Sequence, residues 1–329
     1  MNDMTVRALA LAAGRRPGRF SSWTPQWLLF WWWLLFGLAI ATPRTAVAQD
    51  AAALRARHAS LQSALASNTY GRPIHIESVH NDGDLRGEVY AVVQHPFSTA
   101  APALRGMEHW CDILMLHLDV KMCRWSTSGP ALLTVATARK YDQPLESAAS
   151  VDFSYRVVAS TPEYQQVQLR AESGPLGTSD YLIVLELVPL DAKTSFLHFT
   201  YGYSQGLGGR VAMEAYLATL GRSKVGFTIV DHKPDGAPVY IGNVRGLVER
   251  NCMRYFLAID AYLTASTLPA GEQLERRLSE WHAGAERYPI QLREMGRDDY
   301  LAMKRKEIQH QQATARGTAK PTPTSPDKY

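Results

Sequence analysis

The stretch Gly87–Trp125, GEVYAVVQHPFSTAAPALRGMEHWCDILMLHLDVKMCRW, decides the fold because three patterns follow one another in it. Residues 89–93 form a short apolar run that is typical of a strand. From residue 98 to residue 114, apolar side chains recur at three- and four-residue spacing, which predicts a helix with Ser98 as its N-cap. A strict alternation follows, which predicts a second strand with one apolar face made of Leu116, Leu118, Val120 and Met122.

The segments around this stretch predict a sheet followed by a long helix. Residues 72–97 have the pattern of a β-hairpin, and further strand candidates with short turns between them continue to about residue 205. Such regular spacing indicates a single antiparallel meander. After a helix expected at about 208–221, the chain contains its longest amphipathic helix, roughly Val244 to Thr264, with Arg250 and Arg254 opposite the apolar stripe. We therefore predict an α+β fold in which a curved antiparallel sheet grips a long C-terminal helix.

The N-terminus has the three parts of a secretory signal. A positive segment, GRRPGRF, precedes the uncharged run Trp27–Ala41, and Ala46-Val47-Ala48 then predicts cleavage before Gln49. The run is short for a membrane span, which needs about 20 residues. Four tryptophans within it are unusual for a signal sequence, so an uncleaved inner-membrane anchor is the alternative. We expect a periplasmic or otherwise exported protein close to a membrane.

The charge balance argues against a nucleic-acid partner. Five of the 35 basic and one of the 31 acidic residues lie in residues 1–48, which leaves 30 of each in the remainder. Nucleic-acid binders usually carry a strong excess of basic residues on one face. We therefore expect no nucleic-acid partner for the mature chain.

The three cysteines, Cys111, Cys123 and Cys252, could form a disulfide, a metal site or a reactive thiol. The spacing of His109, Cys111, His117 and Cys123 lacks the tight cysteine pair of common zinc sites, so no metal is expected. In an oxidising compartment two cysteines usually pair. One reversal of the chain separates Cys111 from Cys123, so we favour this pair over Cys123–Cys252. Cys252 would then be a buried free thiol on the long helix.

The order of these elements resembles the START-like superfamily, which also contains polyketide cyclases and is known as SRPBCC or helix-grip. The resemblance is carried by GEVYAVVQHPFSTAAPALRGMEHWCDIL and by the helix VRGLVERNCMRYFLAIDAYL, within residues 72–266. It implies a cavity beneath the C-terminal helix that holds a lipid or another apolar ligand, and in a minority of members catalysis. The chain differs from small members of the superfamily in three features: the exported N-terminus, the helix at 208–221 and a helical C-terminal extension.

The chain is accordingly divided into five parts. These are a signal peptide (1–48), a helical lead-in (49–71), the START-like ligand-binding domain (72–266), a charged helical extension (267–310) and a disordered tail (311–329).

Apolar and aromatic side chains facing the predicted cavity are the candidate ligand-binding residues, with ordinary core packing as the alternative for each. They are Leu118, Val120, Met122, Tyr155, Val184, Glu186, Phe199, Tyr201, Tyr255, Phe256 and Ile259. Tyrosine hydroxyls could anchor a mostly apolar ligand.

Two carboxylates could serve as acid or base, Asp180 and Glu186. Asp180 is expected at a strand entrance in water. Glu186 lies on an apolar face, where a carboxylate either lines a wet cavity or pairs with a cation such as Arg156 or Arg245. We favour a protein that binds a hydrophobic molecule, without a cofactor and without catalysis, and that serves in transport. An enzyme of the same fold and an envelope scaffold are the alternatives.

Overall fold

The computed structural model describes residues 43–138, 143–206 and 224–318, together with the single residues 141, 209 and 211. The chain divides into two compact units, residues 1–45 and 46–329. Only residues 43–45 of the first unit are described, so the fold is that of the second unit. Residues 1–42, which hold most of the predicted signal segment, lie outside the described residues, and so does almost all of the helix expected at 208–221.

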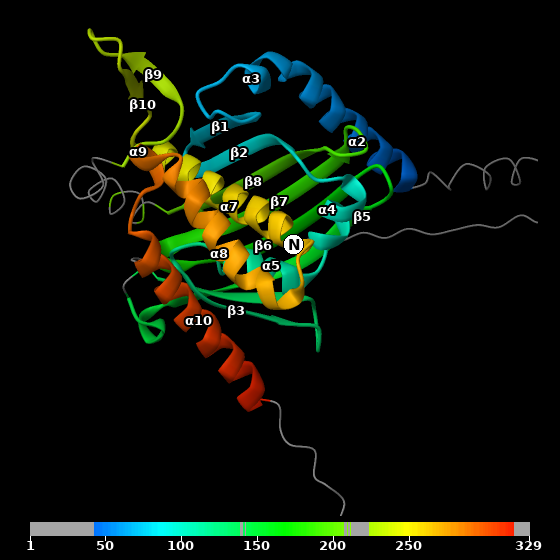
Figure 1. Ribbon diagram of the computed structural model, residues 1–329, viewed down its shortest axis with the longest axis vertical. Helices are drawn as coiled ribbons and strands as arrows, with labels where there is room; N and C mark the ends of the chain where they lie inside the picture. The colour runs from blue at the N-terminus through cyan, green and yellow to red at the C-terminus, as the bar shows by residue number, and fades with distance from the viewer. Residues whose placement is uncertain are drawn as a thin grey trace, which may run out of the picture. The chain divides into compact units, whose positions relative to one another are not determined.

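Eight strands form one antiparallel sheet in the order β1-β2-β8-β7-β6-β5-β4-β3 (Figure 1). β3 to β8 follow one another in the sequence and in the sheet, which confirms the predicted meander. β8 then pairs with β2. The strands are β1 (Ile74–Asn81), β2 (Asp84–Val93), β3 (Val120–Ser126), β4 (Leu132–Thr137), β5 (Ala149–Ser160), β6 (Gln165–Ser173), β7 (Thr178–Pro189) and β8 (Ser195–Gln205). A separate hairpin consists of β9 (Ile229–His232) and β10 (Pro238–Tyr240).

Helices cover both faces of this sheet. They are α2 (Pro43–Ser60), α3 (Gln62–Ala66), α4 (Phe97–Ala103), α5 (Met107–Leu114), α7 (Asn243–Ser266), α8 (Ala270–Glu286), α9 (Pro289–Leu292) and α10 (Arg297–Thr318), with short 3₁₀ turns at Leu145–Ser147 and Pro175–Gly177. The helix predicted from residue 98 is two helices, α4 and α5, and Pro96 takes the N-cap position expected for Ser98. Among the described residues, no helix combines the length and the apolar character that a membrane span requires.

The long helix α7 lies across one face of the sheet, with α8 beside it (Figure 1). Its predicted apolar stripe is buried, including Val248, Cys252 and Phe256. Arg250 and Arg254 were expected on an exposed face, but both are buried because α8 and α9 cover that side of α7. The arrangement is the predicted α+β fold, with an antiparallel sheet and a long C-terminal helix in the START-like manner.

The helix α7 packs tightly against the sheet at Gly87 of β2. A Cβ at this position would lie 2.6 Å from Sγ of Cys252 and 3.4 Å from a methyl carbon of Val248. Only glycine leaves room for the helix at this distance. The thiol of Cys252 is fully buried, and burial raises its pKa well above the ordinary value, so it is the inert buried thiol that the sequence predicts.

A buried carboxylate ties α7 to the sheet and to the segment before β9. Glu249 has no exposed surface and accepts hydrogen bonds from Ser78 Oγ (2.6 Å), the backbone N–H of Phe227 (2.6 Å), and the N–H and Oγ1 of Thr228 (2.9 and 2.8 Å). Hydrogen bonds of this number offset the cost of burying a carboxylate.

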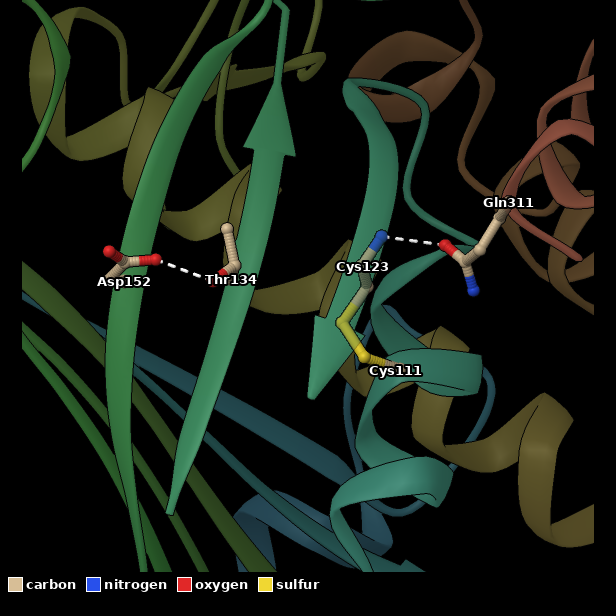
Figure 2. Close-up of a disulfide and its surroundings, with 5 residues drawn as sticks. All are labelled: Cys111, Cys123, Thr134, Asp152 and Gln311. Carbon is tan, nitrogen blue, oxygen red and sulfur yellow. Dashed lines mark hydrogen bonds between the residues drawn. A yellow bond between two sulfur atoms is a disulfide. The ribbon is translucent and has the colours of Figure 1, made fainter. Parts of the chain in front are cut away.

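The disulfide joins α5 to β3, which confirms the predicted pair. The Cα atoms of Cys111 and Cys123 are 5.2 Å apart, within the usual range for a disulfide. Figure 2 shows the same strand held from α10, where Oε1 of Gln311 accepts a hydrogen bond of 2.7 Å from the N–H of Cys123. β3 is therefore fastened from two helices.

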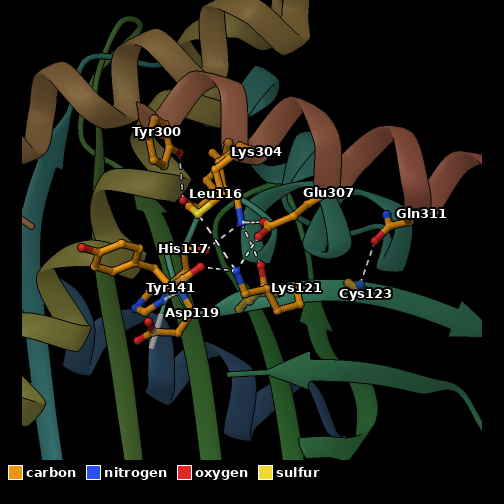
Figure 3. A network of polar contacts seen from close by, with 12 residues as sticks. Leu116, His117, Asp119, Lys121, Cys123, Tyr141, Tyr300, Lys304, Glu307 and Gln311 are labelled. Carbon is orange, nitrogen blue, oxygen red and sulfur yellow. Dashed lines mark hydrogen bonds and ion pairs between the residues drawn. The ribbon is translucent and has the colours of Figure 1, made fainter. Parts of the chain in front are cut away.

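Buried lysines fasten α10 to the start of β3 (Figure 3). Nζ of Lys304 donates to the carbonyls of His117 (3.0 Å) and Val120 (2.8 Å), and it shares Glu307 with Lys121. Burial lowers the pKa of Lys304 to about 8. The charged extension is thus part of the fold, and α10 continues to Thr318, past residue 311, where the disordered tail was expected to begin.

A second, smaller core lies on the other face of the sheet. Leu54 and Leu61 at the N-terminal end of the fold are buried there against Tyr164 and Phe196. The helical lead-in expected before residue 71 therefore packs on the face opposite α7.

Replacing both Cys111 and Cys123 by serine should lower the free energy of unfolding by about 3 kcal/mol, because the cross-link restricts the unfolded chain. Urea unfolding of oxidised wild type and the double variant measures the difference. Reductant should reproduce the loss in wild type and leave the double variant unchanged. Equal unfolding midpoints without reductant would contradict the prediction.

Replacing Gly87 by alanine should destabilise the fold by roughly 1 to 3 kcal/mol, because its Cβ would overlap the Cys252 sulfur. The additional change Cys252→Ala removes that sulfur, so the two changes together should cost less than their sum. Thermal unfolding of the two single variants and the double variant measures this coupling. Gly129→Ala, which meets open space, is the control; strictly additive effects would show that the contact does not limit the packing.

Candidate functional site

Aromatic side chains gather on the α7 face of the sheet, near the end where β7 begins and β8 finishes. We define the tyrosine cluster as Tyr181 of β7, Tyr201 and Tyr203 of β8, and Tyr255 of α7. The ring centroids of Tyr181 and Tyr203 are 5.4 Å apart, those of Tyr201 and Tyr203 5.8 Å, and those of Tyr201 and Tyr255 5.5 Å. These spacings are typical of favourable aromatic pairs.

Strand alternation explains how β8 supplies half of the cluster. Its odd-numbered residues Phe199, Tyr201 and Tyr203 belong to the core beneath α7, whereas Phe196 belongs to the smaller core on the other face. Side chains two residues apart in a strand share a face. A single strand therefore presents a continuous aromatic row to the helix.

The cluster lies at the border between the closed core and solvent. Tyr201 and Tyr203 are 8% and 7% exposed, while Tyr181 and Tyr255 are only half-buried. The neighbouring Phe199 and Phe256 are fully buried. The tyrosine cluster thus combines buried aromatic rings with partly exposed ones on the α7 face.

The phenol groups of the cluster are neutral at physiological pH. Burial raises the pKa of Tyr201 well above its ordinary value, and burial also raises the pKa values of Tyr181, Tyr203 and Tyr255. The hydroxyl of Tyr181 shares a hydrogen bond of 2.7 Å with Oγ1 of Thr178. The cluster therefore offers apolar ring surface with neutral hydroxyl groups.

Most of the predicted ligand-binding residues lie between the sheet and α7. Leu118, Val120, Phe199, Phe256 and Ile259 are buried in the core beneath the helix, with Tyr201 and Tyr255 in the tyrosine cluster. Tyr155 is half-buried on this face, and its hydroxyl donates a hydrogen bond of 2.5 Å to the carbonyl of Arg105. The fully buried residues among them belong to the main core cluster.

Three predicted residues do not share the face that α7 covers. Val184 and Glu186 lie on the opposite face, because Ile183 and Leu185 are the β7 residues that enter the main core. Met122 was expected beside Val120, but a bulge between them shifts the alternation, so that Cys123 points to the core instead. The predicted strand face from Leu116 to Met122 also begins too early, since β3 starts only at Val120.

Glu186 belongs to a polar network on the face opposite α7. Its Oε1 accepts from the hydroxyl of Tyr164 at 2.6 Å, and its Oε2 contacts Nδ1 of His198 at 2.7 Å. On the other side of the imidazole, Nε2 of His198 lies 3.7 Å from Glu88, which accepts from Tyr90 at 2.7 Å. His198 and two tyrosines are therefore the partners in this network, and neither predicted arginine is.

Arg245 lies elsewhere, where its Nε donates to Ser78. Asp180 is exposed near the start of β7, as expected, and accepts a hydrogen bond from Ser179. Neither residue reaches the tyrosine cluster through a hydrogen bond. Asp180 and Glu186, the two carboxylates considered from the sequence, therefore have separate partners.

The histidines near the disulfide lie beside aromatic rings of α7. His117 is buried with its ring stacked on Tyr255 at 4.8 Å, and burial lowers its pKa well below the ordinary value. His109 lies beside Tyr262. In the part of the chain that the structure describes, no group of three or more His, Cys, Asp and Glu residues could hold a metal ion.

The described part of the chain has two surface hollows, and both lie outside the region between α7 and the sheet. One, of about 440 Å³, is lined by residues of α8 and of the connection between α9 and α10, including His282, Arg293 and Glu294. The other, of about 140 Å³, lies at the base of the β9–β10 hairpin, between Tyr70, Phe227, Tyr240 and Tyr288 among others. Neither was foreseen: the first is formed by a turn within residues 282–297, and the second is built by segments far apart in the sequence.

No family model and no curated protein matches the sequence. Among solved structures, the chain is similar to a norcoclaurine synthase point mutant from Thalictrum flavum, with 15% identity over 45% of this chain and 89% of that chain and a TM-score of 0.31. A START superfamily protein from Mycobacterium smegmatis shares 13% identity over 42% and 92%, with a TM-score of 0.28. The ZhuI aromatase/cyclase from Streptomyces sp. R1128 shares 13% over 63% and 94%, with a TM-score of 0.34.

At these identities and TM-scores, the similarities say nothing of this chain's ligand or activity. The assignment of the fold rests on the strand order and on the position of α7 across the sheet.

Because of the network around His198, the free energy of unfolding should be constant over a range of pH and should fall both above and below that range. Burial opposes the charge on His198, but hydrogen bonds to Glu186 and Glu88 outweigh it and raise its pKa. The stability from this group is therefore complete below its ordinary pKa of 6.5 and is lost as pH rises through the raised folded value.

Glu88 sets the low-pH end of the range in which stability is constant. Burial opposes its charge, but hydrogen bonds from His198 and Tyr90 lower its pKa from 4.5 to about 2, so its contribution is lost as pH falls from 4.5 toward 2. Urea unfolding across pH should show the plateau between 4.5 and 6.5. His198→Gln should reduce the loss above pH 6.5 relative to wild type; parallel curves would exclude the imidazole as its source.

Proposed function

We propose that the chain is an exported protein that binds a hydrophobic small molecule or lipid at the tyrosine cluster. The observation that supports this most is the half-burial of Tyr181 and Tyr255 beside the buried rings of Tyr201 and Tyr203. An apolar ligand could cover these rings and extend the core that already exists beneath α7. Aromatic surface with a few neutral polar groups is the usual composition of a small-molecule site.

Binding is favoured over catalysis by the state of the ionisable groups. Glu186, the acid considered from the sequence, is held by Tyr164 and His198 on the opposite face. The thiol of Cys252 is fully buried with a raised pKa, and such a thiol is a poor nucleophile. Neither Glu186 nor Cys252 therefore has the exposure and the placement that catalysis on a ligand at the cluster requires.

Export is supported by the disulfide together with the N-terminal sequence. Cys111 and Cys123 are paired in the folded domain, and stable disulfides are typical of oxidising compartments. Residues 27–41 have the apolar character of a signal or an anchor. We propose that ligand binding next to a membrane serves the transport of an apolar molecule.

A neutral apolar probe, N-phenylnaphthylamine, should bind the purified protein with increased fluorescence. Tyr255→Leu removes an accessible ring of the cluster and should weaken binding about tenfold, equivalent to about 1.4 kcal/mol. Fluorescence titration measures the dissociation constant, and circular dichroism checks that each variant is folded.

Tyr262→Leu is the matched control for this experiment, since Tyr262 is also an α7 tyrosine but contacts His109 and Arg277 outside the cluster. Its binding constant should equal that of wild type. Absence of binding to folded wild type, or equal weakening by both changes, would refute a site at the tyrosine cluster.

A further inference from the structure

The amide oxygen of Gln205 is among the buried polar atoms of the described residues that have no hydrogen-bond partner, and it lies on the α7 face of the sheet. Gln205 is the last residue of β8 and follows Phe199, Tyr201 and Tyr203 on the odd-numbered face. It is 5% exposed, and its Oε1 accepts no hydrogen bond within the described part of the chain. The free oxygen therefore lies at the end of the tyrosine cluster.

An unpartnered amide oxygen is unusual in a folded interior. Leaving such an acceptor buried without a donor costs about 1 to 3 kcal/mol, so most buried amides find a partner. Gln165, which is 1% exposed, illustrates the usual case because its Nε2 donates to the carbonyl of Ala101 at 2.7 Å. Gln205 departs from this pattern at the site that we propose for a ligand.

The side chain of Gln205 interacts with Tyr203. Burial raises the pKa of Tyr203, and the Gln205 side chain lowers it in part. The carbonyl oxygen of Gln205 is the atom left without a donor. The site therefore offers a hydrogen-bond acceptor and needs a donor.

The groups that act on Tyr201 and Tyr203 are neutral, while the carboxylates at this end of the sheet include Asp84, which accepts from Ser204, and the exposed Asp180. Besides burial, the groups that affect the pKa values of Tyr201 and Tyr203 are other tyrosines, the Cys252 thiol and Gln205. Charged side chains act on Tyr255 at the other end, where Asp119 and Arg254 are close. A charged ligand group beside Gln205 would be buried without a counter-charge, which is costly.

We propose that Gln205 is a specificity-determining residue that selects neutral apolar ligands carrying a hydroxyl or N–H donor. The ligand's donor bonds to Oε1 of Gln205, and its apolar body covers the exposed part of the Tyr181 ring. This inference rests on the proposed function, because it assigns a ligand class to the tyrosine cluster.

Four probes of nearly equal ring surface test the proposal on the full mature chain near neutral pH. They are naphthalene, naphthol, its methyl ether methoxynaphthalene, and naphthoate. Displacement of N-phenylnaphthylamine, or calorimetry, gives the dissociation constant of each. Naphthol should bind about tenfold more tightly than naphthalene, as expected for one hydrogen bond worth about 1.4 kcal/mol.

Methoxynaphthalene retains the oxygen but lacks the donor, so it should bind like naphthalene. Naphthoate should bind most weakly because its carboxylate would be buried near the Gln205 oxygen. Equal binding of naphthol and methoxynaphthalene, or tightest binding of naphthoate, would overturn the proposal. These comparisons use wild type and do not depend on the folding of any variant.

The variant Gln205→Leu should bind naphthol and naphthalene equally, since it removes the acceptor and keeps the bulk. Gln165→Leu is the matched control: it also removes a buried amide, but one that already has its partner, and it should keep the preference for naphthol. A Gln205→Leu protein that still prefers naphthol would refute the role of Gln205. If naphthalene, naphthol and N-phenylnaphthylamine all fail to bind, the tyrosine cluster itself is refuted as a site.

Discussion

The contact between α7 and β2 at Gly87 is the constraint on which the rest of the fold depends. A helix can approach a strand this closely only where the strand lacks a side chain, and Sγ of Cys252 occupies the space that a Cβ would take. This depth places Tyr255 of α7 against Tyr201 of β8. The hydrogen bonds to Glu249 fix the same helix near its N-terminal end, so α7 is held both by packing and by polar contacts.

The two faces of β8 have different roles because its side chains alternate. Tyr201 and Tyr203 point to α7 and form the proposed ligand surface, whereas His198 points to the opposite face and joins two carboxylates there. The second network stabilises the packing of that face and does not reach the tyrosine cluster by any hydrogen bond among the described residues. Binding and the pH dependence of stability are therefore expected to vary independently.

The sequence predicted the meander, the long helix and the disulfide because each depends on local periodicity or on the reversal between neighbouring elements. The sequence analysis assigned side chains to the wrong face where helices cover both faces of the sheet. In β7 both faces are covered by helices, so Leu182, Val184 and Val188 looked as suitable for the main core as Ile183 and Leu185 did. The bulge after Val120 cannot be seen in the alternation itself.

The same limit explains why the decisive polar groups were missed. Nothing in the sequence around Glu249 indicates that Ser78 and Thr228, far away in the chain, supply its donors. Gln205 appears at a strand end, where an exposed amide would be ordinary, and only the burial of that end makes its free oxygen informative. The strand pattern identified the tyrosines, but the three-dimensional arrangement is needed to choose among ligands.

Selectivity at such a site should come from its few polar atoms more than from its area. The rings of the cluster are largely buried already, so a ligand gains affinity mainly by covering the remaining surface of Tyr181 and Tyr255. That gain is similar for any apolar body of the same size. A hydrogen bond to Gln205 differs between ligands with and without a donor, and the missing bond leaves a buried oxygen unpaired. In the proposed site, one amide at the end of an aromatic row would therefore be sufficient to discriminate among apolar molecules of equal size.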